Sequence, residues 1–447
     1  MDTNCFSRLG LPDSDGKRFF KILWVVAILA LYPSLLSAQT KRTDDFKNRY
    51  QLKEVVVLSR HNIRAPLSTK GSVLEEITSH PWHDWSAAAS ELTCRGGALE
   101  TMNGLFFRKW LVGAGLFPEN VVPTQDEVNI YANSMQRCIA TAHYFTAAFL
   151  PVANVRVNHR FTPSKMDPVF FPRLTKAGPR FEEEALKQIA AFGGSRGIVG
   201  INEGLKESYD ITARVLDLKD SPACKSGQIC AFDDYNTRII LKKGDEPKMK
   251  GSLKVANTAS DAFILQYYEE PDEKKAAFGH DLTIADWKKI AKIKDVYGDV
   301  LFSAPIVAVN VAHPLLVYMY DELNADNRKF TFLCGHDSNL ASVAAALGVE
   351  DYELPYSIEK KTPIGSKMVI EKWADREGKL YVAINLVYQS TAQLRNIELL
   401  TPDNPPMIFQ VSLKGLSTNA DGLYTLDAVN GRFMEAIRAY ESIEDEQ

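Results

Sequence analysis

Histidine is scarce in this chain, with eight residues among 447, and long runs of like-charged residues are missing. Because the net charge is −4 and no basic stretch occurs, we expect no nucleic-acid partner. Internal repeats and low-complexity tracts are missing as well, which argues against a repeat protein. The 45% hydrophobic and 24% charged residues are ordinary for a globular protein, and the length allows roughly two to three domains or one large domain with an insertion.

Long hydrophobic runs are also missing, apart from one near the N-terminus. The apolar stretch at residues 22–36 follows a basic cluster at 17–21 and precedes Ser37 and Ala38, a pattern typical of a secretory signal peptide. The sequence therefore predicts a signal peptide over residues 1–38 and an exported protein that leaves the membrane after cleavage. An uncleaved membrane anchor is the alternative, because the leader is long and Leu36 is not a small residue.

Cysteine is too scarce for a disulfide-built scaffold. Of six cysteines, Cys5 lies in the leader, so the remaining five leave at least one free thiol or an intermolecular pair. Cys224 and Cys230 bracket a short polar loop and predict a local disulfide in an exported protein. A zinc site would need further Cys or His ligands at suitable spacing, and none lies nearby, so we predict no metal site. The partners of the other three cysteines stay open, namely Cys94, Cys138 and Cys334.

Three segments share one pattern, a short apolar run that ends in polar residues. The runs at 54–59, 128–131 and 330–334 are typical of strands buried on both faces of a parallel sheet. Each run is followed by residues that favour helix starts or loops, such as Asn133 and Ser134 after the second. We therefore expect an α/β fold with a mostly parallel central sheet flanked by helices, and a ligand site at the edge where these strands end.

Residues between about 160 and 300 follow a different pattern. Apolar residues recur there with helical spacing at 181–192, 205–218 and 284–293, and strand-like runs are scarce. The sequence predicts an α/β catalytic domain formed by residues 39–160 and 300–447. It predicts a mainly helical cap domain, inserted at residues 161–299, whose loops cover the site.

The chemistry of the strand ends suits a phosphate ester. Arg60 and Arg64 flank His61, and the planar fork of an arginine binds two oxygens of a phosphoryl group at once. A neutral imidazole such as that of His61 is a competent nucleophile toward phosphorus. The departing alkoxide needs a proton, which the carboxylic acid of Asp337 could supply.

The motif RHNIRAP at residues 60–66, together with His336 and Asp337, resembles the histidine acid phosphatases, the group that includes bacterial phytases. The resemblance extends to the periplasmic glucose-1-phosphatase subgroup, which shares Asn62 where the wider family usually has glycine. Further similar segments run along nearly the whole chain after the leader, at residues 71–75, 131–137, 220–224, 266–269, 335–339, 362–365 and 388–390.

The resemblance implies a role for each residue of the motifs. His61 is the expected nucleophile, and Asp337 is the expected proton donor. The expected phosphate-binding residues are Arg60, Arg64, Arg137 and His336. The resemblance also implies a periplasmic enzyme that needs no metal or other cofactor and acts on small phosphorylated substrates, with sugar phosphates such as glucose 1-phosphate as the expected class.

Two alternatives stay open. A phytase acting on inositol hexakisphosphate would share all of this chemistry and differ only in the cap. An exported anion-binding protein without turnover would keep the phosphate-binding residues, although the retained His61 and Asp337 argue against it. The acidic run at residues 182–184 in the predicted cap favours the smaller substrate, unless these glutamates are simply a solvated helix face.

Overall fold

The computed structural model describes residues 42–67, 71–233 and 236–445. The predicted signal peptide at 1–38, with Cys5, lies outside these residues and stays a prediction. Eight strands form a central sheet, namely β1 (Tyr50–Arg60), β2 (Val128–Ala132), β3 (Val157–Asn158), β6 (Phe330–Gly335), β7 (Lys367–Asp375), β8 (Leu380–Tyr388), β9 (Met407–Gln410) and β10 (Tyr424–Thr425). A separate two-stranded sheet consists of β4 (Arg238–Ile240) and β5 (Lys248–Lys250).

The sheet has the order β10-β8-β7-β1-β6-β2-β3, with β9 paired to β8. The four strands β1, β6, β2 and β3 are mutually parallel, whereas β7 to β10 join by antiparallel pairing. In this register Arg60 of β1 lies opposite Gly335 of β6, and Ala132 of β2 lies opposite Cys334. The carboxyl ends of three strands therefore meet at one edge, as the sequence predicts.

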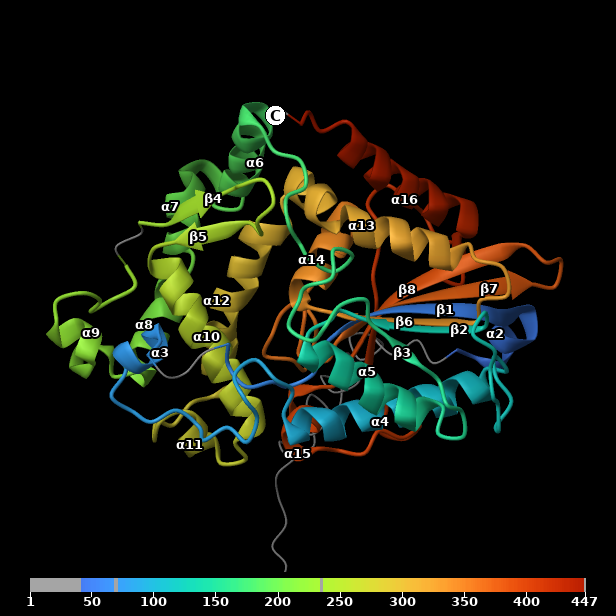
Figure 1. The fold of residues 1–447 in the computed structure, drawn as a ribbon, viewed down its shortest axis with the longest axis horizontal. Coiled ribbons are helices and arrows are strands. Elements are labelled where there is room, and N and C mark those ends of the chain that lie inside the picture. The colour runs from blue at the N-terminus through green and yellow to red at the C-terminus, as the bar shows by residue number, and fades with distance from the viewer. Residues whose placement is uncertain (1–41, 68–70, 234–235, 446–447) are drawn as a thin grey trace, which may run out of the picture. The chain divides into compact units, whose positions relative to one another are not determined.

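Helices cover both faces of the sheet (Figure 1). On one face lie α4 (Cys94–Gly113) and α5 (Gln136–Phe149), and on the other lie α13 (Pro305–Leu323), α14 (Asp337–Ala346) and α16 (Leu426–Glu441). Side chains of β1 alternate between two cores, because successive residues of a strand point to opposite faces. Val55 and Val57 join the core with the aromatic residues of α4 and α5, and Val56 and Leu58 join the core on the other face. This flanked sheet confirms the predicted α/β fold, with an antiparallel portion added to the parallel one.

The region between β3 and α13 is mainly helical and lies to the left of the sheet in Figure 1. Its helices are α6 (Pro179–Ala191), the 3₁₀ turn η1 (Gly194–Arg196), α7 (Gly197–Glu203), α8 (Lys206–Val215), η2 (Leu218–Asp220), α9 (Pro222–Lys225), α10 (Ser252–Glu269), α11 (Glu273–Ala276) and α12 (Ile284–Phe302). Helix α12 continues past residue 299, where the cap was expected to end. The division into a catalytic and a cap domain remains a prediction. The other short helices are α2 (Asp44–Arg49), α3 (Val73–Glu76) and α15 (Thr391–Asn396).

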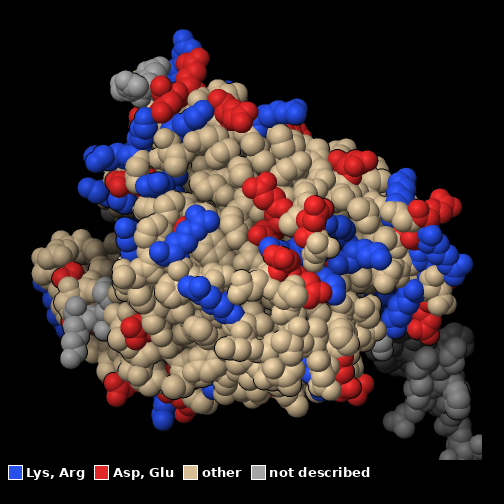
Figure 2. Space-filling view, turned by 45° about the vertical axis from the view of Figure 1, so that its right-hand side comes forward, with Lys and Arg blue, Asp and Glu red and all other residues tan. Residues whose placement is uncertain are grey.

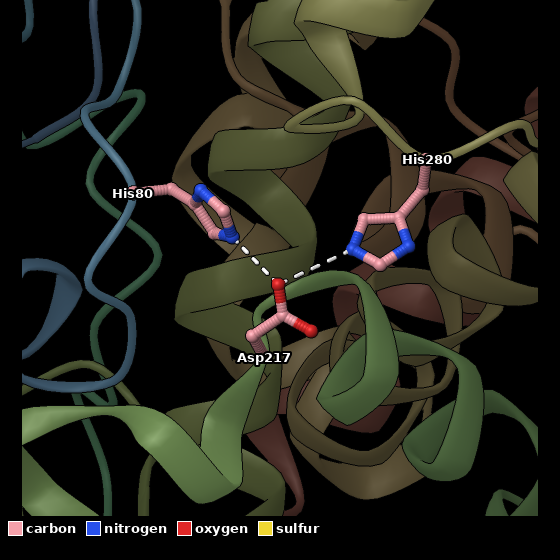
Figure 3. Close-up of side chains that lie close together, drawn as sticks. All are labelled: His80, Asp217 and His280. Carbon is pink, nitrogen blue, oxygen red and sulfur yellow. Dashed lines mark hydrogen bonds and ion pairs between the residues drawn. The ribbon is translucent and has the colours of Figure 1, made fainter.

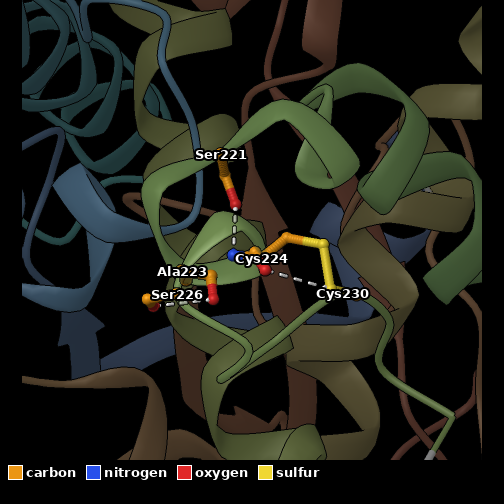
Figure 4. The surroundings of a disulfide bond; sticks show 5 residues. All are labelled: Ser221, Ala223, Cys224, Ser226 and Cys230. Carbon is orange, nitrogen blue, oxygen red and sulfur yellow. Dashed lines mark hydrogen bonds between the residues drawn. A yellow bond between two sulfur atoms is a disulfide. The ribbon is translucent and has the colours of Figure 1, made fainter.

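Cys224 and Cys230 are joined by a disulfide at α9 (Figure 4). The hydroxyl of Ser221 caps this short helix by accepting a hydrogen bond from the backbone N–H of Cys224 at 3.2 Å. Among the described cysteines, Cys94 is an exposed free thiol, whereas Cys138 and Cys334 are buried free thiols.

Within the described ranges, no single helix has both the length and the apolar composition to cross a membrane. Helices α12 and α13 meet that measure only when taken together, and their axes bend by 83° at the break between them.

Candidate active site

The residues singled out in the sequence converge at the edge where β1, β6 and β2 end. His61 follows the last residue of β1, and its backbone N–H donates to the carbonyl of Gly335 at 3.0 Å. His336 follows the last residue of β6, and Asp337 is the first residue of α14. Because the strands are parallel and in register, three sequence segments far apart in the chain meet here. A cavity of about 930 Å³ opens at this edge, and its lining includes His61, Arg64, Arg137, His336 and Asp337.

His61 is almost completely buried, and its ring nitrogens differ in role. Nδ1 lies 2.8 Å from the carbonyl oxygen of Asn62, and since a carbonyl can only accept, Nδ1 carries the hydrogen. The lone pair of the neutral ring is therefore on Nε2. Burial lowers the pKa of His61 well below its ordinary value of 6.5, and the positive charge of Arg137 lowers it further. The imidazole is consequently neutral in mildly acidic solution.

Three arginines surround this imidazole, each held by different partners. Arg60 is buried beneath the cavity and donates from Nη1 to Glu359 Oε1 at 2.7 Å and to the carbonyl of Thr362 at 2.5 Å. Arg64 donates to Asp261 Oδ2 at 2.9 Å. Burial lowers the pKa of Arg137, although an arginine remains a cation throughout the physiological range. Such fixed cations cost little to reorganise when an anion arrives.

His336 is oriented by Asn133 at the end of β2. Asn133 Oδ1 accepts from the backbone N–H of Asp167 at 2.9 Å, which turns Nδ2 toward His336 Nε2 at 2.7 Å. His336 Nε2 is therefore an acceptor, and the ring's hydrogen lies on Nδ1. Arg137 Nη2 lies 3.5 Å from Nδ1, but since both groups are then donors they do not hydrogen-bond to each other. Asn133 and Ser134 lie in the loop between β2 and α5 and do not cap that helix. Helix α5 has Met135 at its N-cap, because Asn133 and Ser134 anchor the segment at 161–167 instead.

Asp337 is ion-paired from two sides. Its Oδ2 accepts from Lys294 Nζ at 2.5 Å and lies 3.6 Å from Arg60 Nη2. Burial alone would raise the pKa of Asp337, but the charges of Lys294 and Arg60 outweigh it and hold the pKa well below the ordinary value. In the ligand-free protein this carboxyl group is therefore ionised.

Sequence reasoning missed several residues that support these groups. Lys294 of α12 and Asp261 of α10 come from the helical region, where a charged residue on a helix is usually solvated and carries no signal. Glu359 lies in a loop without a recognisable pattern. Asp261 and Lys294 line the cavity because α10 and α12 pack against the edge of the sheet, whereas Glu359 is identified by its hydrogen bond to Arg60.

Asn62 and Gly365 form a close contact behind His61. Asn62 Nδ2 donates to Glu100 Oε2 at 3.0 Å, and Glu100 Oε1 pairs with Lys367 Nζ at 2.9 Å in a fully buried ion pair. A Cβ at position 365 would lie 2.7 Å from Asn62 Nδ2, and the φ of +71° at Gly365 is in the left-handed region that favours glycine. Asn62 is thus an integral part of the polar support below the nucleophile.

The acidic run at 182–184 does not line the cavity, so the substrate argument based on it fails. Glu182 and Glu183 are exposed on α6, and Glu184 bonds to Lys187 and Gln188 of the same helix. The cavity lining from the helical region comes instead from α10, α12 and the β4–β5 hairpin. On the face shown in Figure 2, acidic and basic side chains are interspersed, and neither sign forms an extended patch.

The structure also brings together three side chains that could hold a metal ion, although the sequence predicts no metal site. His80 and Asp217 are 137 residues apart in the chain. The side chains of His80, Asp217 and His280 nevertheless meet outside the cavity. No spacing rule applied to the sequence links these three positions.

Comparison with known proteins agrees with the geometry. Residues 51–184 match the model of the histidine phosphatase superfamily, branch 2. A glucose-1-phosphatase of Providencia rettgeri is 37% identical over 90% of this chain and 95% of its own, and one of Salmonella typhimurium is 38% identical over the same shares. The solved apo form of a Hafnia alvei phytase matches with a TM-score of 0.80 at 27% identity, covering 88% of this chain and 98% of its own.

Proposed function

The chain belongs to the histidine phosphatase superfamily, branch 2, and from this membership we propose that it hydrolyses hexose 1-phosphates through a phosphohistidine at His61. The observation that carries the proposal is the buried, neutral imidazole of His61, with Nε2 unprotonated and three arginines around it. A nucleophile that stays neutral in acid, next to fixed cations, suits transfer of a phosphoryl group at acidic pH.

In the first step, the lone pair of His61 Nε2 forms a bond to phosphorus, and the bond from phosphorus to the sugar oxygen breaks. The proton of Asp337 moves to the departing oxygen, which leaves as an alcohol. In the second step, a water oxygen attacks phosphorus and the N–P bond breaks. Asp337 takes up the proton of that water, so both residues return to their starting states and inorganic phosphate is released.

The phosphoryl group carries its charge on three non-bridging oxygens throughout these steps. We assign their binding to Arg60, Arg64, Arg137 and the Nδ1–H of His336. Arginine suits this task because its donors match two oxygens at once and its charge is permanent. Since the charge is shared by every phosphate ester, these residues do not select among leaving groups.

Asp337 must be protonated to act as an acid, although Lys294 and Arg60 favour its ionised form. A bound phosphate dianion brings negative charge against the same cations and weakens their hold on Asp337. Its pKa therefore rises when substrate binds. The carboxyl group gains its proton in the complex, where the leaving group needs it.

The substrate class rests on similarity and on the cavity. The chain is more similar to two glucose-1-phosphatases, at 37% and 38% identity, than to the Hafnia alvei phytase at 27%. Phytate is the second candidate, because six lysines besides Lys294 line the cavity, namely Lys248, Lys250, Lys254, Lys360, Lys361 and Lys414. Carboxylates of the same lining offset part of this charge, since Lys361 pairs with Asp299 at 2.9 Å.

Steady-state kinetics of the purified protein on glucose 1-phosphate, p-nitrophenyl phosphate and phytate test the proposal. We expect the higher kcat/KM on glucose 1-phosphate, with residual cleavage of phytate. A clear preference for phytate would move the protein to the second candidate without changing the assigned roles of His61 and Asp337. No phosphate release from any of the three substrates would refute the mechanism.

We also propose that the protein is exported to the periplasm. Two features support this, the basic and apolar leader at 17–38 and the disulfide between Cys224 and Cys230, since disulfides persist in oxidising compartments. N-terminal sequencing of the protein from a periplasmic extract should give Gln39 as the first residue. Recovery in the membrane fraction with the leader retained would support the anchor alternative.

A further inference from the structure

Three side chains capable of binding a metal meet in the helical region (Figure 3). His80 lies in the loop after α3, Asp217 follows α8, and His280 lies in the loop after α11. Both imidazoles point toward the carboxylate of Asp217, with Nε2 of His80 at 2.7 Å and Nε2 of His280 at 3.5 Å from Oδ2. The three candidate ligand atoms all lie within 4.8 Å of one another.

The backbone holds these ligands in place. Asp217 adopts the left-handed conformation, with φ of 47° and ψ of 45°, which aspartate tolerates better than most residues. The hydroxyl of Thr78 is buried and donates to the carbonyl of Leu216 at 2.7 Å, so the loop that carries His80 is fixed to the end of α8. The ring of His80 also stacks on Phe278, with centroids 5.0 Å apart. The segments of His80 and His280 therefore contact each other as well as Asp217.

Two imidazole nitrogens and one carboxylate oxygen form a ligand set that suits zinc and neighbouring first-row divalent cations. Around tetrahedral zinc, with bonds of about 2.0–2.1 Å, ligand atoms lie about 3.3 Å apart. Two of the three separations, 2.7 and 3.5 Å, lie on either side of that value, and the third lies within 4.8 Å, so side-chain movements on the order of an ångström would complete the geometry. The side chains remain 33%, 44% and 25% exposed for His80, Asp217 and His280, which leaves room for a water as fourth ligand.

We propose that His80, Asp217 and His280 form a binding site for Zn²⁺ or a similar divalent cation that crosslinks the loop after α3 to two segments of the helical region. None of the three residues lines the catalytic cavity. The site is therefore structural, and bound metal stabilises the folded state because the unfolded chain does not hold the three ligands together. The proposal does not depend on which phosphate ester the enzyme hydrolyses.

The alternative explanation of this cluster is an ion pair between Asp217 and protonated histidines, without a metal. Protons and metal compete for the same imidazole nitrogens, so binding is measured at about pH 7.5, above the range in which imidazole usually gains a proton. The two uses differ in a simple way, because only a metal site responds to added zinc or to a chelator.

The test uses purified protein, freed of metal with EDTA and dialysed, and titrated with Zn²⁺ by calorimetry and by thermal unfolding. We expect one zinc bound per chain and a rise in Tm of at least about 2 °C at hundredfold excess over Kd. Asp217→Asn keeps the left-handed backbone accessible and removes the charge, so it should abolish the rise in Tm, as should His280→Gln. The matched controls are Asp220→Asn, three residues along the same turn, and His159→Gln, an exposed histidine elsewhere.

Activity toward p-nitrophenyl phosphate separates this site from the catalytic one. EDTA should leave kcat unchanged while it lowers Tm, and both cluster variants should retain wild-type kcat. Zinc bound instead at His61 and His336 would inhibit turnover, and its effect would persist in His280→Gln. The proposal is overturned if no saturable binding of zinc occurs, or if Asp217→Asn and His280→Gln respond to zinc as the wild type and the controls do.

Discussion

Lys294 Nζ donates a 2.5 Å hydrogen bond to Oδ2 of Asp337, which links α12 to the first residue of α14. Lys294 also lies 3.9 Å from Glu359, the partner of Arg60. A lysine of the helical region thus shares one charge network with the proposed proton donor. Its charge favours the ionised form of Asp337, so it sets the pH range over which that residue can supply a proton.

Replacing Lys294 with methionine should move the basic limb of the kcat/KM profile for glucose 1-phosphate to higher pH. Removing the cation lets the pKa of Asp337 rise, and the acid form then persists to higher pH. Lys289→Met is the matched control, because Lys289 lies on the same helix, pairs with Glu207 and does not line the cavity. An unchanged basic limb in Lys294→Met would show that this lysine does not govern the proton donor.

His61→Ala should lower kcat by a factor on the order of 10⁴ or more while leaving the folded protein intact, because it removes the proposed nucleophile. Wild-type enzyme quenched during turnover should carry one phosphoryl group by mass spectrometry, and the variant should carry none. His159→Ala, at an exposed position, is the control for loss of a histidine. Near-normal activity of His61→Ala would rule out the covalent mechanism.

Asp337→Asn and Arg64→Ala should separate the proton donor from the phosphate-binding residues. Asparagine is nearly isosteric with aspartate but cannot donate the proton, so glucose 1-phosphate should lose about 10²–10⁴-fold in kcat and p-nitrophenyl phosphate far less. Arg64→Ala should reduce kcat/KM on both substrates by similar factors, because it acts on the phosphoryl group that they share. Equal losses on both substrates in Asp337→Asn would argue against its role as general acid.

The depressed pKa of His61 predicts an enzyme that retains activity in acid. Only below its lowered pKa does the imidazole gain a proton and lose its nucleophilic lone pair, so kcat/KM should not fall with a midpoint near 6.5. Arg137→Ala removes a charge that lowers this pKa. Its acid limb should therefore lie at higher pH than that of the wild type, with lower kcat/KM throughout. pH–rate profiles of the two proteins measure the shift, and identical acid limbs would contradict the electrostatic explanation.

The buried ion pair between Glu100 and Lys367 should matter for stability more than for chemistry. Both side chains are fully buried, so Lys367→Met leaves an unpaired carboxylate and should reduce the free energy of unfolding by about 3–5 kcal/mol. Adding Glu100→Leu to this variant should recover part of the loss, since no unpaired charge then remains. Urea denaturation of the single and double variants measures both values. A loss below about 1 kcal/mol in Lys367→Met would show that the pair contributes little.

Features of this protein that depend on local pattern could be predicted from its amino-acid sequence. Apolar runs of four to six residues specified β1, β2 and β6, because a strand buried on both faces needs apolar side chains on both. His61 and His336 could be identified because each directly follows one of those runs, at the strand end where a ligand site is expected. The pair Cys224 and Cys230 could be recognised because the disulfide closes a loop of only a few residues.

Contacts between side chains that are distant in the sequence could not be predicted in this way, and they became visible in the folded chain. Lys294 contacts Asp337, and Asp261 contacts Arg64, because α12 and α10 pack against the edge of the sheet. The hydrophobic periodicity of a helix does not specify which residues its polar side chains will contact. The glutamates at 182–184 were misjudged for the converse reason, since their charge was visible in the sequence but their position was not. Hydrophobic periodicity indicates which face of an element is buried, whereas the identity of the partner depends on long-range packing that no local segment encodes.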